Sequence, residues 1–222
     1  MSQNLENFIV TNKYKDGRGQ IIDFVVNPLK IDNRQLCSPT DDQGSTPSCT
    51  GYSCAQLLES VYWKFTGKPI QLDAKQIYKK AKTIDGNPKN DGTTLEAAMT
   101  SALMLCGFDS EKWSVEKFFK TDDISKSIET VKFLIHKYDF LLGGFHISSG
   151  WERASKTNCF VQKTKKDLGG HCVLICGYDQ HGFYIQNSWG KKWGAMGFAI
   201  VDWERFAEEF VYCAWVSPIF CK

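Results

Sequence analysis

Apolar residues in the first half of the chain recur at intervals of three and four, which is the spacing of an amphipathic helix. The clearest stripe runs through residues 49–65, with apolar side chains at positions 54, 57, 58, 61, 62 and 65. Similar patterns predict helices at 72–81, at 94–105 and after the candidate caps Asp122 and Asp123. The first half is therefore expected to be mainly helical.

The second half changes to short runs that are rich in β-branched and aromatic residues and are separated by turns containing glycine. The predicted strands are 140–147, 172–178, 183–186, 197–202 and 212–216. His181 and Gly182 stand where a hairpin between two of these strands would turn. Helices first and strands later predict an α+β fold, or two lobes with a binding cleft between them.

The composition fits a globular chain without an obvious charged partner. Its 222 residues are 42% hydrophobic, enough for one large domain or two small lobes. The formal charge is +2, so neither nucleic acid nor an anionic membrane is expected as a partner, and the basic run 163–166 is expected to be a solvated loop. The polar start and the lack of a run that could span a bilayer predict a cytoplasmic protein.

The nine cysteines are not expected to form a disulfide framework, because their number is odd and the chain is long. Most are expected to be reduced, buried and apolar in behaviour. Cys54, on the helical stripe, fits that description. Cys49 does not, because it precedes the stripe and follows a polar segment.

Cys49 is the strongest candidate for a reactive thiol. Pro47 can stand just before a helix and Ser48 is a good N-cap, so Cys49 would occupy the first helical turn. Unpaired N–H groups and the positive end of the helix dipole stabilise an anion there, which predicts a lowered thiol pKa. Gln43, otherwise an ordinary loop residue, could join the Cys49 N–H in holding an oxyanion.

A nucleophilic cysteine needs a base that a third group orients. His171 opens the apolar run 172–178 and is the best candidate base, and His146 is its rival. Asn187 follows at the end of the next predicted strand, where a hairpin would place it beside His171 to fix the ring tautomer. Trp189 could cover the bond between them and exclude water.

Four segments together resemble the papain family of cysteine peptidases: Gln43-Gly44, Ser48-Cys49, residues 170–178 (GHCVLICGY) and residues 187–198 (NSWGKKWGAMGF). Cys49 is separated from His171 by 122 residues and from Asn187 by 138. The family's usual separation is about 130–150, so the second value lies inside the range and the first just short of it. The resemblance extends from Asp41 to the C-terminus, with a looser middle.

The resemblance implies a single papain-like catalytic unit over 1–222, with a mainly helical lobe at about 36–120 and a β-rich lobe formed by about 1–35 and 121–222. It implies a thiolate–imidazolium pair of Cys49 and His171, Asn187 as the orienting group and Gln43 as oxyanion donor. It implies hydrolysis of an extended polypeptide through a thioester, with no metal or cofactor.

The same resemblance implies a set of substrate-binding residues. Residues 90–94 resemble the loop whose backbone pairs with an extended peptide, although an ordinary helix entry is an equal alternative. Thr94 and Cys172 would border the main specificity pocket, with Leu141 or Leu142 nearby, and Gly170 would offer its carbonyl. The full set is Asp91, Gly92, Thr93, Thr94, Gly170, Cys172 and Trp189, the last flanking the leaving group.

The sequence also departs from the family pattern. Thr46-Pro47-Ser48-Cys49-Thr50 replaces the usual Cys-Gly-Ser-Cys-Trp, so a common half-cystine is missing, and Asp91 replaces the first glycine of the substrate loop. The 48 residues before Cys49 are too few for the long inhibitory pro-segment of secreted relatives. Residues 1 to about 35 are expected to be a short arm on the β-rich lobe, with inhibition of the cleft as the weaker alternative. An inhibitor protein as partner and the oligomeric state stay open.

Three other interpretations remain. The chain could be a catalytically silent binding protein, although all four candidate catalytic residues are present. It could be an acyl-transferase or isopeptidase that uses the same acyl-enzyme. A zinc site of His171, Cys172 and Cys176 is disfavoured, because strand alternation points the histidine away from both cysteines.

Overall fold

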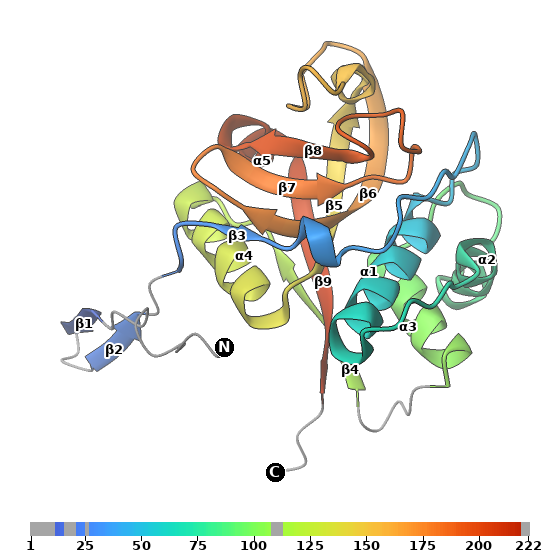
Figure 1. The fold of residues 1–222 in the computed structure, drawn as a ribbon, viewed down its shortest axis with the longest axis horizontal. Helices are drawn as coiled ribbons and strands as arrows, with labels where there is room; N and C mark the ends of the chain where they lie inside the picture. The colour runs from blue at the N-terminus through green and yellow to red at the C-terminus, as the bar shows by residue number, and fades with distance from the viewer. Residues whose placement is uncertain (1–11, 16–20, 25–26, 108–112, 219–222) are drawn as a thin grey trace.

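The computed structural model describes residues 12–15, 21–24, 27–107 and 113–218. Helices and an antiparallel sheet make up this part, so the predicted α+β class is confirmed. The sheet has the strand order β4-β9-β5-β6-β7-β8, and β3 pairs with β6 outside this path. Figure 1 shows the curled sheet beside the helices α1 to α3.

The helices are α1 (Cys49–Thr66), α2 (Ala74–Ile84), α3 (Leu95–Leu105), α4 (Ile124–Tyr138) and the short α5 (Trp203–Glu209). The first four helices follow the predicted stripes closely, whereas α5 was not predicted. Asp73, Thr94 and Asp123 cap α2, α3 and α4, each accepting a bond from a backbone N–H of the first turn. The range predicted for the second helix, 72–81, began two residues too early and ended three too early.

The strands of the sheet lie largely where the sequence predicts them. They are β3 (Ile31–Asp32), β4 (Trp113–Phe119), β5 (Leu141–Ser148), β6 (Asp167–Tyr178), β7 (Gly182–Gln186), β8 (Phe198–Asp202) and β9 (Phe210–Pro218). The predicted hairpin at His181 and Gly182 joins β6 to β7. Two 3₁₀ turns, η2 (Arg34–Leu36) and η3 (Ser149–Arg153), complete this part of the chain.

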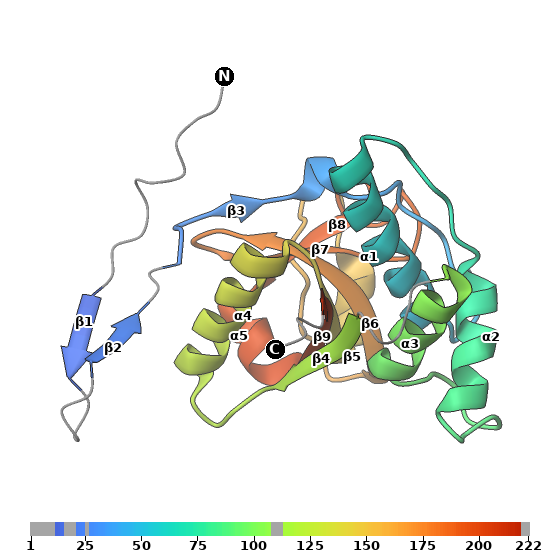
Figure 2. The same ribbon diagram turned by 90° about the horizontal axis from the view of Figure 1, so that it is seen from below.

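Both faces of the sheet are covered by helices. On β6, Cys172, Leu174 and Cys176 pack in the cluster formed with α1, α2 and α3. Val173 and Ile175, which alternate with them, pack in a second cluster with residues of α4 and α5. Figure 2 shows these two groups of helices on opposite sides of the sheet. An apolar run without gaps is what a strand buried on both faces requires.

The N-terminal region lies partly against the sheet. β3 pairs with the end of β6, and the Tyr178 hydroxyl donates to the Pro28 carbonyl over 2.9 Å. β1 (Asn12–Lys15) and β2 (Ile21–Phe24) pair only with each other, and both views draw this hairpin apart from the main body. The rest of the predicted arm, residues 1–11, 16–20 and 25–26, lies outside the described residues.

The assignment of residue ranges to the two lobes stays a prediction. Within it, β4 falls in the range assigned to the helical lobe but pairs with β9 in the sheet. Among the described residues, no helix is both long and apolar enough to cross a membrane.

Candidate active site

Cys49 is the first residue of α1 and lies at the wall of a groove. The groove has a volume of about 790 Å³ and is lined by residues from α1, α2, α3, β5, β6 and β9. Ser48 stands at the N-cap, as predicted, but its side chain makes no capping bond; its hydroxyl lies 2.6 Å from that of Thr46 instead. The first N–H groups of α1 therefore have no side-chain cap.

The pKa of the Cys49 thiol is raised, and the predicted lowering is wrong for the free site. Burial of the thiol is the largest cause, and it outweighs the opposing backbone N–H groups of Cys172, Thr50 and Cys49. Position in the first turn does favour the thiolate. The loss of water around the sulfur, however, raises the thiol pKa by more than the N–H groups lower it.

His171 lies on β6 and is held by Asn187, which follows directly after β7. Its Nε2 is 2.8 Å from Asn187 Oδ1, and the same oxygen accepts the Ser188 N–H over 2.8 Å. Because an amide oxygen can only accept, the bond places the ring proton on Nε2 and leaves Nδ1 for a second partner. The predicted pairing of His171 and Asn187 across the hairpin is thus present in the structure.

Two tryptophans enclose the His171 ring. The ring of Trp189 lies 4.7 Å from it, centroid to centroid, and that of Trp151 meets it edge-on at 6.0 Å. The position of Trp151 is fixed by a hydrogen bond, since its Nε1 donates to Glu209 Oε2 over 2.6 Å. This burial lowers the pKa of His171 to about 4, against the smaller raising effect of the Asn187 bond.

Gln43 lines the same groove and is anchored to the segment that carries Asn187. Its Oε1 accepts the Ser188 hydroxyl over 2.6 Å, and its backbone N–H donates to the Ser188 carbonyl over 2.8 Å. Its Nε2 donates one proton to the Thr46 carbonyl over 2.8 Å, which leaves the second for the groove. The two donors predicted for an oxyanion, Gln43 and the Cys49 N–H, therefore border one space.

The segment that precedes α1 is bound to the hairpin of His171 and Asn187 by further bonds. Gln186 Nε2 donates to the Ser38 carbonyl over 2.7 Å, and the Gly190 N–H donates to the Asp41 carbonyl over 2.9 Å. Ser53 of α1 adds a bond of 2.9 Å to the Cys172 carbonyl. These bonds fix α1 against β6, which places Cys49 and His171 at one groove.

The predicted substrate-binding residues all line the groove: Asp91, Gly92, Thr93, Thr94, Gly170, Cys172 and Trp189. Gly92, however, is engaged within the chain. Its N–H donates to the Tyr78 hydroxyl over 3.1 Å, and its carbonyl accepts Lys82 Nζ over 2.8 Å. Thr94 is the N-cap of α3, so the helix entry offered as an alternative is also present.

Leu141 and Leu142, predicted as neighbours of the specificity pocket, do not line the groove themselves. Both are fully buried, one in each core cluster. The residues of β5 that line the groove are Gly144, Phe145, His146 and Ile147. His146, the rival base, lies at the edge with its Nε2 2.9 Å from Asp167 Oδ2, and both side chains are exposed.

Sequence reasoning missed several residues of the groove. Tyr212 of β9 lines it and accepts the Leu95 N–H over 3.1 Å, which ties α3 to the sheet. Outside the lining, Ser188 bonds to Gln43, and the Trp151 ring packs against that of His171. Tyr78 and Lys82 are four residues apart on α2, so helical spacing could have indicated that they share a face, but not that the face meets Gly92.

Comparison with known proteins gives a consistent result. No model of a known protein family matches the chain. It is 26% identical over 207 residues to the oryzain gamma chain of Oryza sativa subsp. japonica, covering 82% of this chain and 57% of that protein. It is 28% identical over 207 residues to pro-cathepsin H of Medicago truncatula, covering 82% and 59%. The chain thus spans less than two thirds of the length of these relatives.

Solved structures share the fold. Xylellain, a cysteine protease from Xylella fastidiosa, matches with a TM-score of 0.65 and 19% identity over 88% of each chain. Digestive procathepsin L 3 of the Tenebrio molitor larval midgut matches with a TM-score of 0.63 and 15% identity, covering 96% of this chain and 75% of that one.

Proposed function

Because the chain is related by sequence and by fold to the papain-like cysteine peptidases, we propose that it hydrolyses peptide bonds with Cys49 as the nucleophile. The observation that carries the proposal is the oriented imidazole. His171 is bonded to Asn187 on one side and lines the same groove as Cys49. A thiol, a base and an orienting amide are the parts that acyl transfer through a cysteine needs.

The reaction starts from uncharged groups. Burial raises the pKa of Cys49 and lowers that of His171 to about 4, so the free site holds a thiol and a neutral ring. His171 then takes the thiol proton as the sulfur attacks the peptide carbonyl. The Cys49 N–H and Gln43 stabilise the oxyanion, each contributing about 3 kcal/mol.

The remaining steps return the site to its starting state. His171 passes the proton to the leaving amine as the carbon–nitrogen bond breaks and a thioester forms on Cys49. A water molecule, deprotonated by His171, then attacks the thioester, and the departing sulfur recovers the proton. None of these steps calls for a redox partner.

An extended polypeptide is the proposed substrate, since the groove that Cys49 lines is also lined by residues of α2, α3, β5, β6 and β9. A cytoplasmic location remains a proposal. It is supported by the described cysteines, which are all free thiols and suit a reducing compartment.

Cleavage of a mixed peptide library, followed by mass spectrometry, tests the proposed activity. Cys49→Ala should abolish cleavage and labelling by the epoxide inhibitor E-64, whereas Cys159→Ala, a half-buried thiol outside the groove, should leave both intact. Full cleavage by Cys49→Ala would refute the assignment. Binding of peptides without cleavage by the unaltered protein would favour the silent binding protein, and transfer to an added amine would favour the transferase.

A further inference from the structure

Gly92 lies on the loop between α2 and α3 with both of its main-chain polar groups already bonded. The Tyr78 hydroxyl accepts its N–H, and Lys82 Nζ donates to its carbonyl. Its φ of +75° is in the left-handed region, so the turn suits glycine. The loop is thereby closed onto α2.

A second set of bonds fixes Lys82 in this place. Asp85 Oδ2 accepts Lys82 Nζ over 2.9 Å and the Thr93 hydroxyl over 2.7 Å. The side chains of Lys82 and Asp85 are only 12% and 5% exposed. The bond from Thr93, with those from Asn87 and Lys82, lowers the pKa of Asp85 to about 2, which keeps the carboxylate ionised at any ordinary pH.

The closed loop changes how a peptide can be held. A backbone N–H has one proton to donate, and that of Gly92 is taken, so an incoming peptide carbonyl finds no donor there. An ammonium has three protons, and Lys82 uses two, on Asp85 and on Gly92. Lys82 also lines the groove, and among the described residues that do so it is the one lysine or arginine.

We propose that Lys82 binds a main-chain carbonyl of the peptide substrate in place of the Gly92 N–H, and that Tyr78 keeps Gly92 closed. The inference rests on the proposed function only in taking the groove as a peptide site. A neutral carbonyl fits better than a carboxylate. The charge of Lys82 is already matched by Asp85, and the exposed Asp91 borders the same end of the groove.

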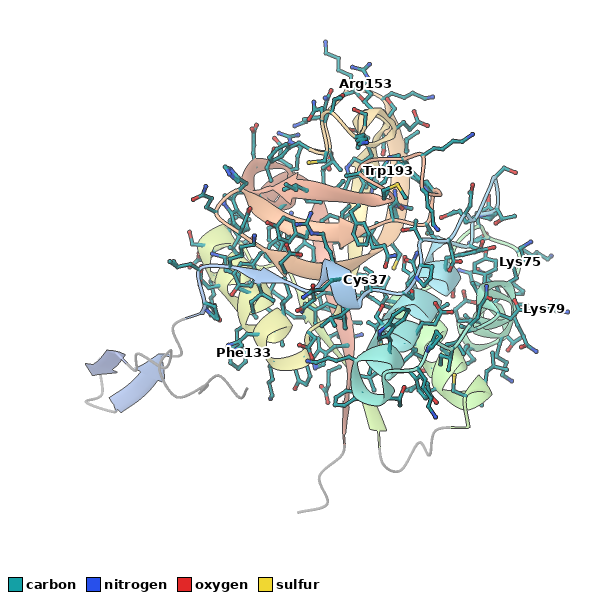
Figure 3. The ribbon with its side chains drawn as sticks, in the orientation of Figure 1. Cys37, Lys75, Lys79, Phe133, Arg153 and Trp193 are labelled. Carbon is teal, nitrogen blue, oxygen red and sulfur yellow. The ribbon has the colours of Figure 1, made fainter. Side chains whose placement is uncertain are left out.

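Peptide affinity, measured by fluorescence anisotropy in the Cys49→Ala background, tests the proposal without depending on cleavage. Lys82→Met should weaken binding roughly tenfold to a hundredfold, the usual loss for a hydrogen bond to a charged group. Lys79→Met is the matched control, since Lys79 projects outward from α2 near Lys75 (Figure 3) and is exposed. Equal affinity of the Lys82 and Lys79 variants would overturn the proposal.

A second measurement separates contact with the peptide from mere loosening of the loop. Replacing each peptide bond of the ligand in turn by an alkene removes one carbonyl at a time. One of these replacements should weaken binding to the protein that keeps Lys82. The same replacement should cause no further loss of affinity in Lys82→Met, because both changes remove the same bond. Strictly additive losses at every position would refute the contact.

Tyr78→Phe tests the other half of the proposal. Without the hydroxyl, the Gly92 N–H should exchange with solvent at least tenfold faster, and peptide affinity should stay equal or rise, because a donor is freed. Unchanged exchange, or weaker binding, would contradict the closed loop. A protein that binds peptides through Lys82 but cleaves none would refute the activity alone.

Discussion

His171 Nε2 and Asn187 Oδ1 lie 2.8 Å apart, although sixteen residues separate the two in the chain. The β6–β7 hairpin brings them together, and the Ser188 N–H, bonded to the same oxygen, fixes which way the amide faces. The ring is held at Nε2 and covered by Trp189, so its position does not depend on a bound substrate.

Replacing Asn187 by Asp should shift the pH dependence of cleavage. A carboxylate beside the ring stabilises the imidazolium, so the pKa of His171 should rise from about 4, by about 1–3 units. Because the neutral ring is the proposed base, the acid limb of kcat/KM should move to higher pH by the same amount. Asn158→Asp, on an exposed loop, is the control, and an unmoved acid limb would count against His171 as base.

Replacing Ser188 by Ala should lower kcat with little change in KM. The Ser188 hydroxyl holds Gln43 Oε1 at 2.6 Å, and without it the amide keeps only its bond to Thr46. Oxyanion donors act on the transition state, so about tenfold of kcat should be lost, compared with about 10²–10³ for Gln43→Ala. Steady-state kinetics decide this. If only KM changed, Gln43 would contribute to binding of the substrate rather than to stabilisation of the transition state.

The stability of the protein should rise with pH between about 4 and 6.5 because of His171. Its pKa falls from 6.5 to about 4 on folding, so in this interval the unfolded state binds more protons than the folded state. The difference corresponds to roughly 3 kcal/mol in the free energy of unfolding. Urea unfolding across the interval measures it.

The matched variants for that measurement are His171→Gln and His136→Gln. The first should lose most of the slope, and the second should keep it, because His136 is exposed on α4. A slope that survives in His171→Gln would assign the effect to other groups.

Gly51→Ala should destabilise the packing of α1 on α2. A Cβ at this position would lie 2.5 Å from the Ala74 carbonyl oxygen and 2.9 Å from Tyr78 Cβ, so the helices would have to move apart. Overpacking of this kind costs about 1–3 kcal/mol, measurable by urea unfolding. Gly170→Ala, with no atom within 4 Å of its added Cβ, should cost far less. Equal costs would show that the helix contact is not tight.

The sequence predicts those helices and strands whose hydrophobic pattern is visible within their own residues. β6 has apolar residues on both faces and reads as an uninterrupted run. β4 was missed because it carries Glu116 and Lys117 and lies at the edge of the sheet, where charged residues are common. α5 was missed because it has only 7 residues, too few to show a helical period.

The candidate site likewise has features that the sequence predicts and features that depend on how distant elements pack. Cys49, His171 and Asn187 are marked by motifs, and the hairpin between the last two is readable from turn residues. The pKa of Cys49 could not be predicted, because burial of the sulfur depends on how α1 meets β6. Nor could the closure of Gly92, which depends on the distance from the loop to Tyr78 and Lys82.

The bonds from Ser38, Asp41 and Gln43 to the segment 186–190 have a consequence for the growing polypeptide during translation. Cys49, the proposed nucleophile, leaves the ribosome on a helix that can form at once, but His171 and Asn187 are made more than a hundred residues later. A nascent chain therefore carries Cys49 without its proposed partners until Asn187 has been made. Release of a fragment that stops before Asn187 would leave a thiol with no working base.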